Sequence, residues 1–130
     1  MPYLVKWLVE GRVIYSSPTG IVTADDVKKS YGEIHAILDT CEPFVHVITD
    51  ATRMDKNTIG LSDLIGIINS APSSPNMGWS VYISKSKLDR FFASVSTQIN
   101  KTRSREFDNI ADGIAFLQEQ DPTLPPIPLP

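Results

Sequence analysis

The stretch GWSVYISKSKLDRFFASVSTQI, residues 78–99, contains the two periodicities that decide the fold. Its first seven residues alternate between two faces, which is typical of a strand. Ser86 and Asp89 then have the spacing of a capping box, and apolar residues follow at helical intervals. The predicted core stripe of this helix consists of Leu88, Phe91, Phe92, Val95 and Ile99. A strand that leads directly into a helix is therefore the repeating unit of the fold.

The same change of period occurs on both sides of this stretch. Two apolar runs, 3–9 and 12–15, are separated by Glu10-Gly11 and predict an antiparallel hairpin. The later patterns predict a helix over 23–41, a strand over 44–48, a loop over 51–57, a helix over 61–70, a strand over 78–84, a helix over 86–99, a strand over 105–107 and a helix over 109–121. The predicted order is ββαβαβαβα.

Strands that alternate with helices of this length imply parallel pairing, because a parallel neighbour is reached only through a long crossover. We therefore predict an α/β fold: a mixed, mainly parallel five-stranded sheet with an N-terminal antiparallel hairpin and about four helices. Gly32, inside the first helix, predicts a close approach of that helix to the sheet. Residues 1–121 form one domain, and the proline-rich tail 122–130 is expected to be extended, disordered or packed on a neighbouring subunit.

Composition narrows the class of protein. With 130 residues, 42% hydrophobic and 21% charged, the chain has the profile of a single globular domain. A net charge of -3 argues against nucleic acid or a membrane surface as the main partner. The single Cys41 excludes an internal disulfide, and no apolar run approaches the ~20 residues of a spanning helix. Without a leader segment, the sequence predicts a cytoplasmic location.

Three segments carry a resemblance to a known family: GIVTADD at 20–26, VITD at 47–50 and REFDNIADGIAFL at 105–117. In this order they resemble STAS-like domains, named from sulfate transporters and anti-sigma-factor antagonists, especially the bacterial stage II sporulation protein AA-like group. The resemblance extends over roughly residues 3–121. It implies a small, non-catalytic regulatory module that binds a protein partner.

The resemblance also implies a modification site. In the antagonist proteins, a serine or threonine where the loop after the third strand enters the second helix is phosphorylated and controls partner binding. Thr58 and Ser62 are the closest matches here, although the Asp-Ser-Ser-Gly block of the family is not intact. The alternative is that one of the two hydroxyls only caps the second helix.

Catalytic and metal-binding patterns are weak in this sequence. His46 shares a strand face with Ile48, so we expect a hydrogen-bonded core imidazole; Cys41 is expected to be a small buried apolar residue and His35 a surface residue. Neither the histidines nor the carboxylates have the spacing of a metal site, and no glycine-rich phosphate loop is present. We therefore predict no catalytic residue, no metal and no cofactor.

A ligand site is predicted where the parallel strands end. Lys85, Ser86 and Lys87 precede a helix whose exposed amides favour an anion, and Asp50 and Arg53 follow the neighbouring strand. We expect Met54 and Leu61 to give this pocket an apolar lining. The alternative is that the charged residues are solvated loop residues.

Two functions follow from the sequence. The first is a non-catalytic regulatory or protein-interaction module, which binds a protein partner or forms a homodimer through the aromatic side of the first hairpin. The second is a binding or sensor protein for a small anionic or lipid-like molecule, with its pocket at the carboxyl edge of the sheet.

Overall fold

The computed structural model describes residues 3–57, 60–70, 74–100 and 103–130. The elements are β1 (Tyr3–Val9), β2 (Val13–Pro18), β3 (Gly20–Val22), α1 (Ala24–Leu38), β4 (Val45–Asp50), β5 (Met54–Asn57), α2 (Leu61–Ser70), β6 (Met77–Ile83), α3 (Lys87–Asn100), β7 (Ser104–Phe107) and α4 (Ile110–Gln120).

The main sheet has five strands in the order β1-β2-β4-β6-β7. β1 and β2 are antiparallel, with Trp7 opposite Ile14, and the other three pairs are parallel. The register places Tyr15 beside Ile48 and Ile48 beside Val81, so the central strands share one continuous row of buried side chains. The predicted mixed, mainly parallel sheet with an N-terminal hairpin and four helices is confirmed.

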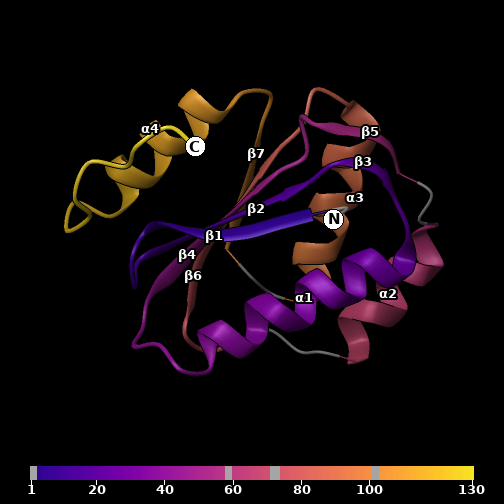
Figure 1. Ribbon diagram of the computed structural model, residues 1–130, viewed down its shortest axis with the longest axis horizontal. Coiled ribbons are helices and arrows are strands. Elements are labelled where there is room, and N and C mark those ends of the chain that lie inside the picture. Colours follow the sequence, from indigo (N-terminus) through magenta and orange to yellow (C-terminus); the bar gives the residue numbers. More distant parts are fainter. Residues whose placement is uncertain (1–2, 58–59, 71–73, 101–102) are drawn as a thin grey trace.

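Helices cover the two faces of this sheet unequally (Figure 1). α1, α2 and α3 lie on one side, whereas α4 and the C-terminal residues lie on the other. We call these the three-helix face and the α4 face. The core of the α4 face consists of Val13, Tyr15, Ile48, Val81, Ile83, Ile114, Leu117 and Ile127. The core of the three-helix face consists of Ile14, Ile34, Leu38, Val45 and Val47.

Two helix starts have the capping interactions that their sequences predict. The Thr23 hydroxyl accepts a hydrogen bond from the amide of Asp26, while the Asp26 carboxylate accepts one from the Thr23 amide. Asn109 caps α4 through the amide of Asp112. These contacts satisfy backbone amides that have no partner within the first turn of a helix. α1 ends at Leu38, three residues before the predicted end at Cys41.

The predicted loop over 51–57 is wrong in its second half. Residues Met54–Asn57 form β5, which pairs in parallel with β3 in a separate two-stranded sheet. β3 is separate from β2 because the chain turns at Gly20, whose φ of 65° favours glycine. The sequence of β5 is Met-Asp-Lys-Asn, which has no apolar alternation, so its pattern did not predict a strand.

Gly32 does not mark a close approach of α1 to the sheet. No heavy atom lies within 4 Å of the place where a Cβ would stand on Gly32, and the residue is exposed. The predicted contact is wrong because the face of α1 that packs on the sheet contains Ile34 and Leu38 instead.

The predicted core stripe of α3 is only partly buried. Leu88 is 62% exposed and Phe91 is 56% exposed, whereas Phe92 and Val95 are half-buried. α3 therefore has an apolar surface at its N-terminal end, in a helix that covers the edge of the sheet beside β7.

The proline-rich tail packs on its own domain. Ile127 is only 8% exposed and belongs to the core of the α4 face, and Leu124 packs against the same cluster. Residues 125–130 form no helix or strand, as expected for an extended tail, and they pack on their own domain; packing on a neighbouring subunit stays a prediction. The apolar Leu and Ile between the prolines fill the space beside α4.

Candidate functional site

A cavity of about 210 Å³ lies between the sheet and the helices of the three-helix face. It is lined by the carboxyl-terminal halves of β2, β4 and β6, by β7, and by side chains from all three helices. The helix residues that form its apolar wall are Val27, Ile34, Leu64, Ile67, Phe92 and Ala93. The cavity thus occupies the half of the three-helix face that the apolar core does not fill.

The floor of the cavity is formed by hydroxyl-bearing side chains of the sheet. Ser16, Thr49 and Ser80 line it from three neighbouring strands, and the register places Ser16 beside Thr49. Apolar residues are expected on a sheet face that is covered by helices. A row of hydroxyls in that position provides hydrogen-bonding groups under an apolar wall, which is the usual composition of a small-molecule pocket.

Tyr82 adds a hydroxyl of particular interest. Burial, and secondarily the charge of Asp89, raise the pKa of the Tyr82 phenol well above its usual value, so the hydroxyl stays protonated. Tyr82 is half-buried and lines the cavity, so its phenol is one of the polar groups that a molecule in the cavity can contact.

Carboxylates dominate the charge of the cavity. Asp26, Asp89 and Glu106 line it from α1, α3 and β7. Hydrogen bonds from the amide and the hydroxyl of Thr23 lower the pKa of Asp26, which therefore stays ionised. Arg105 also borders the cavity, but its guanidinium lies over the ring of Phe116 on the α4 face, 5.1 Å from the ring centroid.

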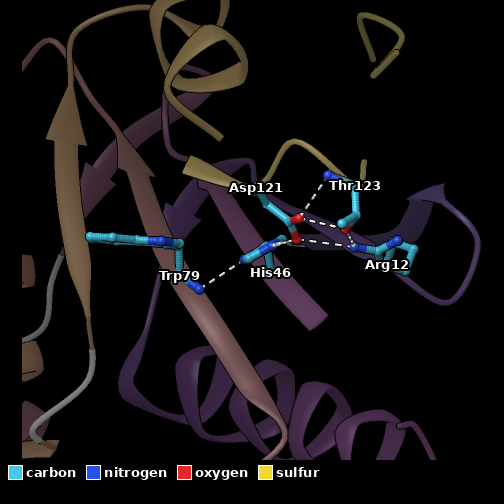
Figure 2. A network of polar contacts seen from close by, with 5 residues as sticks. All are labelled: Arg12, His46, Trp79, Asp121 and Thr123. Atoms are coloured by element: carbon cyan, nitrogen blue, oxygen red, sulfur yellow. Dashed lines mark hydrogen bonds and ion pairs between the residues drawn. The ribbon is translucent and has the colours of Figure 1, made fainter. Parts of the chain in front are cut away.

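A second polar cluster lies on the α4 face (Figure 2). His46, which is 3% exposed, bonds through Nε2 to Asp121 Oδ2 at 2.9 Å, and its Nδ1 accepts a hydrogen bond from the Trp79 amide at 2.9 Å. Arg12 donates to Asp121 at 3.0 Å and to the Thr123 hydroxyl at 2.7 Å. This network joins two strands of the sheet to the first residues after α4.

The local irregularity of the sheet explains the place of His46 in this network. The register between β4 and β6 shifts between Val45 and Val47, which frees the Trp79 amide for the imidazole. A Cβ on Gly78 would stand 2.5 Å from His46 Nδ1, so only glycine leaves room for the ring.

The partners of His46 decide its chemical state. Because Nδ1 accepts a hydrogen bond from a backbone amide, the ring proton is on Nε2 and is donated to Asp121. Both ring nitrogens are therefore engaged, as expected for a hydrogen-bonded core imidazole. The hydrogen bonds from Thr123, and then that from His46, lower the pKa of Asp121 to about 2.

The predicted charged ligand residues lie apart from the cavity. Asp50 is buried and accepts hydrogen bonds from the Tyr15 hydroxyl at 2.6 Å and from Thr52. Arg53 is exposed, as are Lys85 and Lys87, and none of these residues lines the cavity. Ser86 caps the first turn of α3 by accepting a hydrogen bond from the Asp89 amide.

Of the remaining predicted site residues, Met54 lines the cavity. Leu61 is the first residue of α2, and Ser62 follows it, exposed, in the first turn of that helix. Thr58 lies outside the described residues.

The cavity floor was missed in the sequence, although a signal was present. Ser16 and Thr49 lie in strands whose other residues are mostly apolar, and each is on the face that the helices cover. A hydroxyl at such a position indicates either a local hydrogen bond or a polar cavity, and the sequence alone does not distinguish them.

Other reactive residues do not assemble into a further site. Cys41 is half-buried against the core of the three-helix face, and His35 is half-buried beside the ring of Tyr31. Among the described residues, no group of three or more His, Cys, Asp or Glu side chains could hold a metal ion. The helices in this part of the chain are all too short or too polar to cross a bilayer.

No model of a protein family matches this chain, and no curated protein does. Among solved structures, it is similar to an uncharacterized protein from the DUF3478 family of Shewanella loihica PV-4, which is described as having a SpoIIAA-like fold. The TM-score is 0.61, the identity is 13%, and the similarity covers 88% of this chain and 91% of that chain. This chain has a SpoIIAA-like fold.

The likeness confirms the fold expected from the resemblance to STAS-like domains. It extends over most of both chains, so the SpoIIAA-like fold accounts for the described sheet and its helices together. At 13% identity the likeness concerns the fold alone, and function has to be argued from the site.

Proposed function

We propose that this chain is a non-catalytic binding module that takes a small molecule into the cavity beneath α1, α2 and α3. The observation that carries the proposal is the composition of that cavity, which combines a floor of hydroxyls, a wall of apolar helix residues and the phenol of Tyr82. Interiors of proteins are close-packed, so an unfilled space of this kind within a covered sheet face is a feature that requires an occupant or a function.

The volume limits the occupant. A cavity of about 150 Å³ holds one benzene molecule, so one of about 210 Å³ has room for roughly eight to ten non-hydrogen atoms. The ligand is therefore the size of a metabolite fragment, smaller than a fatty acid or a nucleotide.

The state of His46 supports the non-catalytic part of the proposal. A general base needs a ring nitrogen that is free to accept a proton from a substrate. Both nitrogens of His46 are engaged inside the α4 face, and the imidazole does not line the cavity.

Filling the cavity tests the proposal. Ala93 lines the cavity from α3, and Ala93→Leu places three more carbon atoms in it without disturbing helix propensity. The matched control is Ala115→Leu at an exposed position of α4. Native mass spectrometry of protein purified under mild conditions is expected to show a bound small molecule in the wild type and in Ala115→Leu, and none in Ala93→Leu. The same occupancy in all three proteins would refute the cavity as the site.

A second candidate is a regulatory module that binds a protein partner, as the resemblance to STAS-like domains implies. Two observations favour it. Leu88 and Phe91 form an exposed apolar pair three residues apart on α3, and exposed apolar surface on a soluble domain is typical of contact sites. Ser62 is exposed in the first turn of α2, where a phosphate would be stabilised by the helix dipole.

The two parts of this candidate are tested separately. Leu88→Gln combined with Phe91→Gln should abolish any self-association seen by sedimentation velocity and any partner captured by the wild type. Intact-mass measurement of protein from its native cells, with Ser62→Ala and Thr58→Ala as references, reports whether either hydroxyl is phosphorylated. Wild-type protein that is monomeric, captures no partner and is never modified would exclude the regulatory function.

A further inference from the structure

We propose that the molecule bound in the cavity is an organic amine that is positively charged at neutral pH and has a short apolar body. This inference rests on the proposed binding function and adds the charge and the size of the ligand. It departs from the anionic ligand that the lysines around Ser86 predict, because those lysines do not line the cavity.

The first argument is the sign of the charges that surround the cavity. Three carboxylates line it, Asp26, Asp89 and Glu106, and they come from three different elements. Of the basic side chains in the described part of the chain, only that of Arg105 borders the cavity, and its guanidinium stacks on Phe116 on the opposite face. Carboxylates thus outnumber basic groups among the side chains that line the cavity, which favours a cation over an anion as the ligand.

The arrangement of β7 explains how this charge separation arises. Ser104 and Glu106 lie on the three-helix face, opposite Ser80 and Tyr82, whereas Arg105 alternates to the other face. A single strand thus directs its carboxylate into the cavity and its guanidinium away from it.

The second argument is the hydroxyl of Tyr82. Tyr82 lines the cavity beside Glu106, and burial keeps its hydroxyl protonated. A phenol oxygen accepts a hydrogen bond from an ammonium group, and its ring provides an electron-rich face for the same cation. Tyr82 and Glu106 are neighbours in the register of β6 and β7, so both can bind one ammonium group.

A metal ion does not fit this site as well as an amine. The three carboxylates are not among any group of side chains in the described residues that could hold a metal ion. Separated carboxylates give a negative field without a coordination sphere, whereas metals require several ligands at short distance. The apolar wall of Val27, Leu64 and Phe92 also favours a ligand that is partly hydrocarbon.

Three small probes of the same shape test the charge. 2-Phenylethylamine, 2-phenylethanol and phenylacetate share a phenyl ring and differ mainly in a positive, a neutral and a negative end. Isothermal titration of the purified full chain at pH 7 is expected to give the amine an affinity about tenfold higher than that of the alcohol, since a charge-assisted hydrogen bond replaces a neutral one. Phenylacetate is expected to bind more weakly than either.

Substitutions then identify the groups that recognise the amine. Glu106→Gln keeps the size of the side chain and should weaken amine binding about tenfold while leaving the affinity for the alcohol within twofold. Tyr82→Phe should weaken the binding of both 2-phenylethylamine and 2-phenylethanol. The control is Glu119→Gln, an exposed position on α4, which should change neither affinity.

The outcomes separate the two proposals. Equal affinity for all three probes, abolished by Ala93→Leu, would overturn the amine inference and leave the binding function standing. Preference for phenylacetate would overturn it as well. No binding by any probe would reject the amine, and if the native protein also carries no small molecule, the binding function falls with it.

Discussion

The two faces of the sheet differ in what their side chains do. On the α4 face, buried aliphatic residues and the tail residue Ile127 form the larger apolar core, and the His46–Asp121 network connects the sheet to the residues after α4. On the three-helix face, the apolar core covers one half of the strands, and hydroxyls and carboxylates surround a cavity in the other half. Both faces are formed by the same five strands, whose successive side chains point alternately to one face and to the other. The two faces therefore differ in which residues occupy the alternate positions.

This division separates stability from binding. The face with the larger close-packed apolar core contributes more of the free energy of folding, because that free energy depends on the burial and close packing of apolar side chains. A face with a cavity lacks part of that contribution and gains room for a ligand. Substitutions on the α4 face should therefore affect unfolding, and equivalent substitutions around the cavity should affect binding.

Two leucines, one on each face, are expected to differ most in how much stability is lost when each is replaced by alanine. Leu117 of α4 is fully buried, and Leu117→Ala should lower the free energy of unfolding by about 3 to 4 kcal/mol, because it leaves a cavity in a packed core. Leu64 of α2 is half-buried on the cavity wall, and Leu64→Ala should cost about 1 kcal/mol. Urea unfolding measures both, and equal losses would contradict the division between the faces.

Replacing each of two glycines by alanine is expected to change stability in opposite directions. Gly78→Ala places a Cβ against His46 Nδ1, so the ring must move away from Asp121 or the strands must separate; we expect a loss of about 2 to 3 kcal/mol. Gly32→Ala meets no atom within 4 Å on an exposed side of α1 and should stabilise the protein by about 0.5 to 1 kcal/mol. Thermal unfolding followed by circular dichroism compares them, and a destabilising Gly32→Ala would refute the open surroundings of Gly32.

The sequence predicted the elements that have strong periodicity and missed those that depend on distant contacts. The helix starts at Thr23 and Asn109 were predictable because their caps are local, and β6 was predictable from its alternation. β5 was missed because a methionine followed by three polar residues has no strand alternation and forms a strand only by pairing with β3. The exposure of Leu88 and Phe91 was missed because helical spacing does not show which side of a helix has a neighbour.

The candidate sites were also predictable only where they depend on residues close together in the sequence. The burial and hydrogen bonding of His46 were predicted from its place among apolar neighbours in a central strand. Its partner Asp121 is 75 positions away in the sequence, so the network was not predictable. The charged residues at the strand ends are adjacent in sequence and therefore predicted a ligand site, whereas the cavity is lined by residues from ten of the eleven elements.

The network on the α4 face predicts a dependence of stability on pH. The pKa of Asp121 is lowered from 3.8 to about 2 in the folded protein, so the ionised carboxylate stabilises the fold above pH 4, and this contribution is lost as the pH falls from about 4 towards 2. Asp121→Asn should cost about 1 kcal/mol at pH 7 and should flatten the acid limb of the stability curve.

The control for this prediction is Asp55→Asn, at an exposed position of β5. It should leave both the stability at pH 7 and the acid limb unchanged. An Asp121→Asn variant with the same acid limb as the wild type would show that the network does not contribute through the carboxylate charge.

Two threonines, one on each face, give the smallest expected difference in stability. They are also the most closely matched pair, because both are replaced by valine. Thr123 donates its hydroxyl proton to Asp121 at 2.5 Å and accepts from Arg12, so Thr123→Val removes two hydrogen bonds and should cost about 1 kcal/mol. Thr49 lines the cavity floor, and Thr49→Val keeps the β-branched shape, so the free energy of unfolding should change by less than about 0.5 kcal/mol.

Binding is expected to reverse the order of these two variants. Thr49→Val removes a polar group from the cavity and should weaken the binding of 2-phenylethanol and 2-phenylethylamine, whereas Thr123→Val is on the opposite face of the sheet and should leave both affinities as they are in the wild type. Urea unfolding and isothermal titration of the same two variants therefore show directly whether one face determines stability and the other determines binding. If Thr49→Val loses as much stability as Thr123→Val and no affinity, its hydroxyl serves the core, and the cavity floor is structural.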